Sequence, residues 1–398
     1  MMSRWNDLHT PCYIIDKQRL DKNTKDLQEG FRKCWGAPVI FGYSVKTNSL
    51  PWMITYMKAH GFLAEVVSEQ EYRLARRLGF DIHEIVLNGP VKSEELLLEA
   101  LNGGAYVNLD NFEEIAVIER RVAERAREWK VGLRYSFELE EVCPGETIVG
   151  KEHGRFGFHV ESGAFEEAVT RLKCCKGVQI TGLHGHSSTR TKSLGIFGAI
   201  AGKAAELMEK YNLQPEYVDI GGGFFGDKPG APDYQEYGDV IAKAFHDRAQ
   251  LKLIVEPGAS LVSSPIGYLT RVVNVRDAGE MRFATLDGSN VHINPQFHNI
   301  SFQKELLLAD NEREKRERQT LCGYTCIEMD RLGKLEMEKE LKTGDKIFFK
   351  NCGSYSMTLA PLFISYFPRV YVDDGIECKC VREAWSEEEF LQKCEVYR

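Results

Sequence analysis

Lys46 is the first residue whose position suggests chemistry. It lies in the segment FGYSVKTNS, at the end of an apolar run that begins at Val39. A lysine at the carboxyl end of a barrel strand reaches the face where such barrels bind ligands, and its amine can form a Schiff base with an aldehyde cofactor. Taken alone, a lysine at a strand end is more often solvated or salt-bridged. The interpretation therefore depends on its companions.

Three consecutive glycines suggest a place where the backbone meets an anion. Gly221, Gly222 and Gly223 follow an apolar run in VDIGGGFFG. Without side chains they allow the backbone to approach a phosphate and offer it N–H donors. The alternative is a tight turn between a strand and a helix. Phosphate sites of TIM barrels often follow the seventh and eighth strands, which favours the phosphate reading.

A carboxylate follows at the end of the next apolar run, in VEPGASLV. Glu256 is expected to point from the strand end into the mouth of a barrel, and Gly258 can add another backbone donor. The alternative for Glu256 is an ion pair with Arg134 or Arg155.

Two histidines, His184 and His186, lie in the segment GLHGHSSTRT, in which the sixth predicted strand ends. Side chains alternate along a strand, so one imidazole is expected to face the ligand and the other to lie differently. Zinc ligation is the rival interpretation, but no third ligand at a suitable spacing is visible. An imidazole stacked on a flat heteroaromatic ring needs only one residue, and Ser188 and Thr189 could donate to a phosphate. We therefore predict no metal.

The elements that must position these residues alternate along the chain in a regular way. From residue 38 onward, short β-branched runs alternate with helical segments, which is typical of parallel βαβ units. Eight strands are predicted, at residues 39–46, 63–68, 84–87, 105–109, 131–136, 178–186, 217–220 and 253–256. Between them, Pro51 and Gly61 suit the start and end of a helix, and Asn111 and Glu114 have capping-box spacing. The pattern predicts an α/β fold, a (β/α)8 barrel with its active site at the carboxyl ends of the strands.

After about residue 262 the pattern changes to strand-like runs such as YLTRVVNV, RFATLDG, KIFFKNC and RVYVDDG. These runs predict a second, mainly β domain over 263–398, after a barrel over 36–262. The first strand of the N-terminal segment, 1–35, is expected to join the β domain. The charged stretch at 309–319 is predicted to be a solvated loop or helix face, because its charges are mixed in sign.

Composition narrows the class of partner. The net charge is −8 without a dense basic block, which gives nucleic-acid binding little support, so we expect a small-molecule partner. No apolar run approaches the length of a membrane span, and MMSRWNDLHT has no signal-peptide core, so we expect a cytoplasmic protein and no membrane partner. The eleven cysteines show neither a disulfide framework nor CxxC zinc spacing, which suits a reducing compartment.

Together, the motifs YSVKTN, HGHSST, DIGGGF, EPG, CGYTCIEMD and GSYS occur in the order found in the ornithine and diaminopimelate decarboxylases. TPCYIID near the start, LRYS at 133–136 and RFGF at 155–158 are similar to further landmarks of that family. The chain therefore resembles the fold-type III, alanine-racemase-like decarboxylases that use pyridoxal 5'-phosphate, and it is closest in pattern to diaminopimelate decarboxylases. The resemblance covers nearly the whole chain.

The resemblance implies a role for each matched position. Lys46 would form the Schiff base, His186 would stack on the pyridine ring, and Cys326 of the partner subunit would donate a proton. Glu256 would pair with the pyridine nitrogen, with Arg134 as a buttress. The phosphate would be held by Thr189, Gly222, Gly223, Gly258 and Tyr355. Because a carboxylate keeps the ring nitrogen protonated, the ring could accept the electron pair left by departing carbon dioxide.

A cysteine contributed by the partner subunit implies a homodimer with sites at the interface.

The chain departs from this family where the distal end of the substrate is held. Ile327 stands where relatives that act on diamino acids place an acid, and Ala259 and Asn294 stand where diaminopimelate decarboxylases commonly have arginines. An unpaired distal charge in a closed site costs on the order of several kcal/mol, so neither ornithine nor diaminopimelate is expected as the substrate. Replacement substrate contacts are predicted at Glu328, Asp330 and Asn294, and could also come from His292 and His298.

Two other functions fit the same plan. A racemase would share the fold and the lysine, but typically carries an arginine near the pyridine nitrogen, where this chain has Glu256. A cofactor carrier or inactive homologue is disfavoured by the β domain and by the retained Lys46 and glycines.

Overall fold

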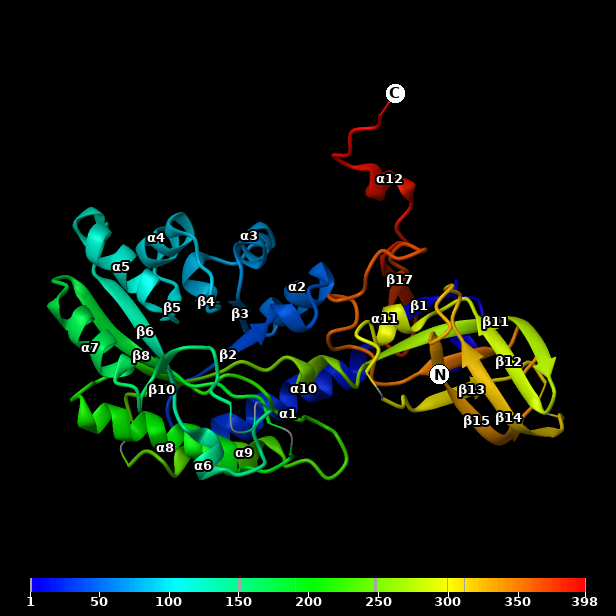
Figure 1. Cartoon of the computed structure of the whole chain (residues 1–398), viewed down its shortest axis with the longest axis horizontal. Coiled ribbons are helices and arrows are strands. Elements are labelled where there is room, and N and C mark those ends of the chain that lie inside the picture. Colours follow the sequence, from blue (N-terminus) through cyan, green and yellow to red (C-terminus); the bar gives the residue numbers. More distant parts are fainter. Residues whose placement is uncertain are drawn as a thin grey trace. The chain divides into compact units, whose positions relative to one another are not determined.

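The computed structural model describes residues 2–148, 150, 152–189, 191–246, 249–298, 300–310 and 312–397. The chain divides into two compact units (Figure 1). One unit is Asn23–Ser260, here called the barrel unit, and the other joins Met1–Lys22 to Leu261–Arg398, here called the β unit. The helix segment after Lys22 thus belongs with the barrel, whereas the prediction placed it in a separate segment that ended at residue 35.

The barrel unit is built on eight parallel strands. They are β2 (Val39–Ser44), β3 (Leu63–Val66), β4 (Ile85–Leu87), β5 (Tyr106–Leu109), β6 (Trp129–Ser136), β8 (Val178–His184), β9 (Tyr217–Asp219) and β10 (Lys252–Val255). Their order is β5-β4-β3-β2-β10-β9-β8-β6, and pairing of β5 with β6 closes the ring. A short strand, β7 (Phe158–His159), adds to β6. The predicted (β/α)8 barrel is confirmed.

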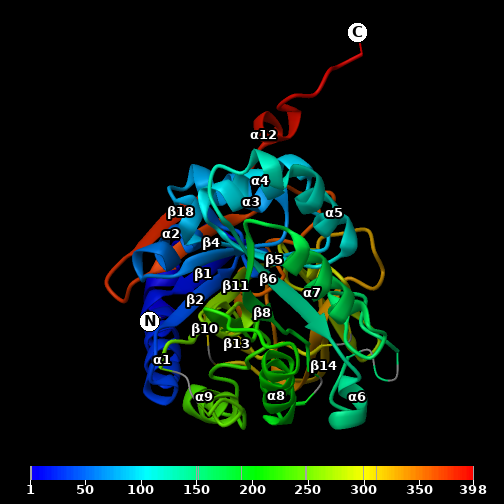
Figure 2. The same cartoon turned by 90° about the vertical axis from the view of Figure 1, so that its left-hand side faces the viewer.

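Helices surround these strands, as Figure 2 shows. They are α1 (Lys17–Trp35), α2 (Pro51–Ala59), α3 (Glu69–Arg77), α4 (Glu94–Gly103), α5 (Phe112–Arg121), α6 (Leu139–Val142), α7 (Ala164–Cys174), α8 (Gly195–Lys210) and α9 (Tyr234–Ala242). Pro51 opens α2, where its missing N–H costs nothing. The Asn111 side chain caps α5 by accepting from the Glu114 N–H, as the sequence predicts. Within the described residues, no helix is long and apolar enough to cross a bilayer.

The interior of the barrel is apolar at depth and polar toward the carboxyl ends of its strands. Val86, Tyr217 and Ile254 form a buried cluster. Gly182 leaves room for the Tyr217 ring, because a Cβ at Gly182 would lie 2.0 Å from that ring. The Tyr217 hydroxyl donates to Asn108 Oδ1 at 2.9 Å, which satisfies the phenol inside the barrel. This is where the packed core gives way to the polar site.

The β unit contains a nine-stranded sheet. Its strands are β1 (Cys12–Asp16), β11 (Ile266–Ala278), β12 (Met281–Leu286), β13 (Lys304–Leu307), β14 (Lys315–Cys322), β15 (Arg331–Lys339), β16 (Lys346–Phe349), β17 (Arg369–Asp373) and β18 (Cys378–Arg382). β1 lies between β11, to which it is antiparallel, and β17, to which it is parallel. Three short helices accompany the sheet or precede it: α10 (Ala259–Val262), α11 (Asn290–Ile293) and α12 (Glu387–Leu391).

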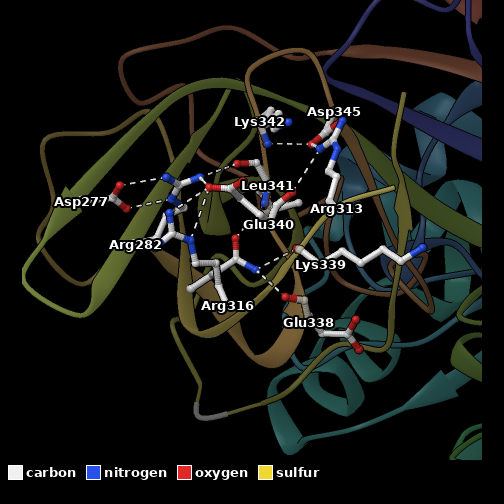
Figure 3. Close-up of polar contacts among 11 residues, drawn as sticks. Asp277, Arg282, Arg313, Arg316, Glu338, Lys339, Glu340, Leu341, Lys342 and Asp345 are labelled. Atoms are coloured by element: carbon white, nitrogen blue, oxygen red, sulfur yellow. Dashed lines mark hydrogen bonds and ion pairs between the residues drawn. The ribbon is translucent and has the colours of Figure 1, made fainter. Parts of the chain in front are cut away.

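The charged stretch at 309–319 was predicted to be a solvated loop or helix face. Its described residues are mostly exposed, as predicted, but residues 315–319 form part of a strand and Arg313 is not solvated. From Lys315 onward it is strand β14. The Arg313 side chain is only 4% exposed and donates to Asp345 at 3.0 Å. Nearby, Arg282 donates to Asp277 at 2.7 Å and lies 2.6 Å from Glu340 (Figure 3). The prediction of a solvated face therefore fails at Arg313, which pairs with the buried Asp345, and holds for the exposed residues 315–318.

Candidate active site

A cavity of about 1350 Å³ lies in the barrel unit at the carboxyl ends of the strands. Its polar lining comes from widely separated parts of the sequence, which the closed barrel brings together. The lining residues used below are Lys46, Glu65, Asn88, Arg134, His184, His186 and Glu256. Four of the residues predicted from the sequence, Lys46, His186, Glu256 and Arg134, thus line one cavity.

Lys46 lies just beyond β2, in a single 3-10 turn (Val45–Thr47). Its Nζ is 2.7 Å from Glu65 Oε2 and 2.8 Å from Ser44 Oγ, and its side chain is 39% exposed. Glu65 itself is buried. Burial acts to raise the pKa of Glu65, but the charge of Lys46 and the hydrogen bonds from Lys46, Ser44 and Asn88 outweigh it, so the pKa is lowered. The site therefore holds an amine that can be reached from the cavity, oriented by a fixed carboxylate.

A chain of side-chain amides connects the carboxyl groups of the site. Asn88 donates to Glu65 Oε1 at 3.1 Å and to Glu256 Oε1 at 2.5 Å. Asn108 donates to Asn88 Oδ1 at 2.9 Å and to Asp219 Oδ2 at 3.0 Å. Each amide thus holds two groups in fixed positions, which leaves the carboxyls little freedom to reorient.

The two carboxyl groups at the ends of β9 and β10 titrate far from their ordinary range. Burial raises the pKa of Asp219 to about 7, although hydrogen bonds to Glu256 and the Gly221 N–H oppose the change. Burial and the nearby charges of Asp219 and Glu65 raise the pKa of Glu256 well above its usual value. Strongly shifted carboxyls in a cavity are typical of functional sites.

The two histidines of the GLHGHSSTRT segment differ as expected, but the strand alternation used to predict this is not the reason, because residues two apart on a strand face the same side. They differ because β8 ends at His184 and His186 lies beyond it. His186 lines the cavity and its Nδ1 accepts from the Gly222 N–H at 3.2 Å. His184 is buried, with Nε2 3.8 Å from Glu256 Oε2. Burial, assisted by the charge of Arg134, lowers the pKa of both imidazoles, that of His186 to about 3. Both rings are therefore neutral at pH 7.

The glycine segment forms a turn that tolerates no larger residue at its centre. Gly221 and Gly223 adopt φ values of +67° and +92°, and a Cβ on Gly222 would lie 2.3 Å from the Glu256 carbonyl oxygen. A Cβ on Gly258 would lie 2.2 Å from Thr47 Oγ1. Close backbone approach of this kind is what a phosphate cradle requires. Together with the Lys46 amine, it makes the described residues compatible with an aldehyde cofactor that carries a phosphate.

Two predicted cofactor residues make contacts other than the expected ones. Arg134 was expected to buttress Glu256, but its Nη1 donates to Asp110 Oδ1 at 3.1 Å, and the donor to Glu256 is Asn88. The Arg134 guanidinium also lies over the Phe156 ring, 4.6 Å from its centroid. The Thr189 hydroxyl donates to the Thr191 carbonyl at 3.0 Å, within its own loop.

The argument against zinc from sequence spacing does not hold in three dimensions. The ligand atoms of His184, Asp219 and Glu256 lie within 4.8 Å of one another, and so do those of Glu138, His153 and His159. The third ligand was not visible in the sequence because each group draws on more than one strand or loop. The first group includes Glu256, which is predicted from the sequence to contact the ring nitrogen of the cofactor.

The remaining predicted residues belong to the β unit and are described with it. Cys326 is exposed, Tyr355 is 44% exposed, and Glu328 is exposed with an ion pair to Arg331 at 2.7 Å. These side chains lie on loops between the strands of the β unit.

Two of the predicted substrate residues are engaged inside the β unit. Asp330 is buried and accepts from Ser289 Oγ at 2.7 Å and Thr325 Oγ1 at 2.6 Å. Asn294 is buried and exchanges hydrogen bonds with the backbone of His298. This bonding favours structural roles for both over the substrate contacts expected of them.

Sequence reasoning missed four polar residues of the site: Glu65, Asn88, Asn108 and Asp219. Each lies at or just beyond the carboxyl end of a barrel strand, in the segments LAEV, VLN, YVNL and YVD. A polar residue that ends a short apolar run is a usable signal in a barrel, because these ends face the active site. The prediction applied this signal only where a glycine, lysine or histidine drew attention.

Comparison with known proteins places this geometry in a family. Residues 19–263 match the family model described as the pyridoxal-binding domain of pyridoxal-dependent decarboxylases. A probable chloroplastic diaminopimelate decarboxylase of Oryza sativa is 26% identical over 400 residues, covering 96% of this chain and 79% of the relative. Diaminopimelate decarboxylase of Archaeoglobus fulgidus is 25% identical, covering 88% of this chain and 84% of the relative.

Solved structures share the fold. A diaminopimelate decarboxylase from M. jannaschii superposes with a TM-score of 0.88 at 20% identity, covering 100% of this chain and 94% of that chain. The Helicobacter pylori diaminopimelate decarboxylase complexed with L-lysine gives 0.84 at 20% identity, covering 98% of each chain.

Proposed function

Because this chain belongs to the family of pyridoxal-dependent decarboxylases, we propose that Lys46 is the residue that binds the pyridoxal phosphate aldehyde in the barrel cavity. The enzyme is a carboxy-lyase that decarboxylates an amino acid. The observation that carries the assignment of Lys46 is its amine, which lines the cavity 2.7 Å from a buried carboxylate.

We assign the other site residues around this bond. When bound, pyridoxal phosphate supplies an aldehyde that reacts with the amines of Lys46 and the substrate. It also supplies a ring that accepts the electron pair left on the substrate when carbon dioxide departs. Gly222, Gly223 and Gly258 offer the backbone approach that a phosphate needs. His186, neutral and lining the cavity, is placed to pack on the ring, and Glu256 is placed to hold a proton at the ring nitrogen. Glu65 orients the Lys46 amine through the ion pair between them.

Protonation of the substrate carbon is assigned to a thiol of a second subunit. Cys326 is exposed, as a residue acting on another chain must be. Loops of the β unit also expose apolar side chains, at Met329, Phe363 and Ile364. Covering these side chains with a second subunit would be favourable, which is consistent with the proposed homodimer. Because all eleven cysteines are free, a reducing compartment, the cytoplasm, is the proposed location.

The substrate is proposed to be an amino acid whose distal group differs from those of ornithine and diaminopimelate. Ile327, Ala259 and Asn294 carry no charge to pair with a distal ammonium or carboxylate. An unpaired charge in a closed site would cost on the order of several kcal/mol of binding free energy.

A panel of amino acids incubated with the holoenzyme, with carbon dioxide release as the readout, tests this function. We expect release from at least one amino acid, and Lys46→Ala should lower kcat by about 10³-fold or more and abolish the visible absorbance of the bound cofactor. Lys210→Ala, on the exposed end of α8, is the matched control and should keep both.

Solvent deuterium exchange at the α-carbon without carbon dioxide release would instead indicate the racemase alternative. That alternative gains no support from the matched family or from the relatives named above, which are decarboxylases.

A further inference from the structure

The buried carboxyl groups of the site have too little positive charge near them for all to be ionised. Glu65, Asp219 and Glu256 are 1%, 0% and 6% exposed. The cation Lys46 lies directly against Glu65. An ionised carboxylate without a partner is costly to bury, so such a group takes up a proton instead.

The contacts of Asp219 and Glu256 indicate where that proton lies. Asp219 accepts from the Gly221 N–H at 2.9 Å and from Asn108 Nδ2 at 3.0 Å, and two donors stabilise the ionised form. Glu256 accepts from Asn88. Asp219 and Glu256 also share a hydrogen bond, which requires a proton on one of them. Since Asp219 already receives two protein donors, the carboxyl that carries the proton is Glu256.

His184 supplies a second observation, independent of the contacts between the carboxyl groups. Among the described residues, neither ring nitrogen of His184 has a hydrogen-bond partner, although the ring is buried. Its Nε2 lies 3.8 Å from Glu256 Oε2. Burial first, then the charge of Arg134, keeps the pKa of His184 low, so the ring brings no positive charge that would ionise Glu256.

We propose that Asp219 is a positioning residue that keeps a proton on Glu256 in the cofactor-free protein, ready for transfer to the cofactor's pyridine nitrogen. On binding, the O–H bond of Glu256 breaks and an N–H bond forms at the ring, which leaves a carboxylate beside a pyridinium. No proton is drawn from solvent, and the negative charge of Asp219 makes Glu256 a stronger base. The inference rests on the proposed role of Glu256.

Titration of this pair depends on the groups that face it from the surrounding strands. The titratable groups that face the pair are Lys46, Glu65, Tyr135, His184 and Tyr217. Of these five groups, only Lys46 carries a positive charge at pH 7.

Infrared spectroscopy of the cofactor-free full-length protein tests the proposal without reference to activity. At pH 7 we expect the carbonyl-stretch band of a protonated carboxylic acid, which should shift when glutamate carboxyls are labelled with ¹³C and vanish in Glu256→Gln. In Asp219→Asn the band should titrate away at a pH lower by about one unit or more, because a neighbouring negative charge is gone. The asparagine keeps an oxygen to accept from the Gly221 N–H.

The matched control is Glu114→Gln. Glu114 is also a buried glutamate, but it forms an ion pair with Lys92 at 2.9 Å, so this variant should keep the band. The proposal is overturned if the band is missing at pH 7, persists in Glu256→Gln, disappears in Glu114→Gln, or moves only with ¹³C-labelled aspartate. Should Asp219→Asn fail to fold, the labelled spectra of the wild type and Glu256→Gln still decide. A decarboxylase without the band would keep its function and lose only this inference.

Discussion

At the scale of single residues, the molecule buries neutral imidazoles in both units. His292, in the β unit, is held by hydroxyl groups, with Tyr268 Oη 2.5 Å from Nδ1 and Tyr324 Oη 3.4 Å from Nε2. Burial lowers the pKa of His292 to about 4. Phenols on both ring nitrogens explain why His292 stays inside the β unit and is a poor candidate for a substrate contact.

His292 gives a prediction for the pH dependence of stability. Below about pH 6.5, His292 binds a proton in the unfolded chain but stays neutral in the folded chain until the pH approaches 4. The free energy of unfolding therefore decreases as the pH falls from about 6.5 toward 4. The contribution is about 1.4 kcal/mol per pH unit. In His292→Gln we expect the slope between about pH 6 and 4.5 to flatten by about that amount, measured by urea unfolding of the cofactor-free protein. The exposed His298→Gln is the control, and an unchanged slope in His292→Gln would contradict the prediction.

At the same scale, the sequence located the residues with distinctive chemistry better than those with ordinary chemistry. Lys46 and Glu256 could be predicted to line the site because each ends an apolar run in a recognisable motif. Asn88 and Asn108 were missed, because an asparagine at a strand end is also typical of a turn and is therefore a weaker signal than a lysine or glutamate in a recognisable motif. Their role depends on closure of the barrel, which places side chains from β4, β5 and β9 within hydrogen-bond reach.

At the scale of elements, the turn after β9 depends on its glycines. A Cβ on Gly222 would lie 2.3 Å from the Glu256 carbonyl oxygen, so a side chain there would push apart the turn and the end of β10. The Gly222 N–H also donates to His186 Nδ1, so a shift of the turn would disturb this hydrogen bond as well.

Gly222→Ala is therefore expected to weaken cofactor binding by about tenfold or more, because overpacking typically costs 1 to 3 kcal/mol. The measurement is the dissociation constant of pyridoxal phosphate from its absorbance titration. Gly202→Ala is a matched control, since Gly202 lies within α8 with no atom within 4 Å of an added Cβ. That control should bind the cofactor normally and unfold no more easily. Equal affinities in the two variants would mean that the turn does not hold the phosphate.

Elements of the barrel were easier to predict than those of the β unit. All eight predicted barrel strands occur, because buried parallel strands are continuous apolar runs bounded by helices. β14 and β15 are rich in charge, so they lack the apolar runs that mark the barrel strands. The sequence alone also does not show that Arg313 and Asp345, each just before a strand, pair with each other and are buried.

At the scale of the whole molecule, the proposed dimer makes each active site the product of two chains. If Lys46 and Cys326 act on one substrate from different subunits, then Lys46→Ala and Cys326→Ala are each defective at a different part of the same site. A heterodimer of the two variants would carry one intact site and one doubly defective site.

Mixing the two variants under conditions that allow subunits to exchange should therefore restore about a quarter of the wild-type activity. Half of the dimers would be heterodimers, each with one working site out of two. The measurement is carbon dioxide release after mixing, with each variant alone as the control. No recovery, in a mixture shown by mass spectrometry to contain heterodimers, would place both residues in the same subunit's site or remove Cys326 from the chemistry.

The position of β1 has a consequence for how the chain acquires its structure during synthesis. Cys12 pairs with Leu269 on one side and with Arg369 on the other, so β1 is synthesised before the barrel unit and both of its partner strands are synthesised after it. The barrel unit, Asn23–Ser260, is continuous and has all its strands before those partners are made. Domains generally fold as units while translation continues. Until β11 and β17 have been synthesised, β1 would expose unpaired backbone N–H and C=O groups, which can bind chaperones or pair with strands of other chains.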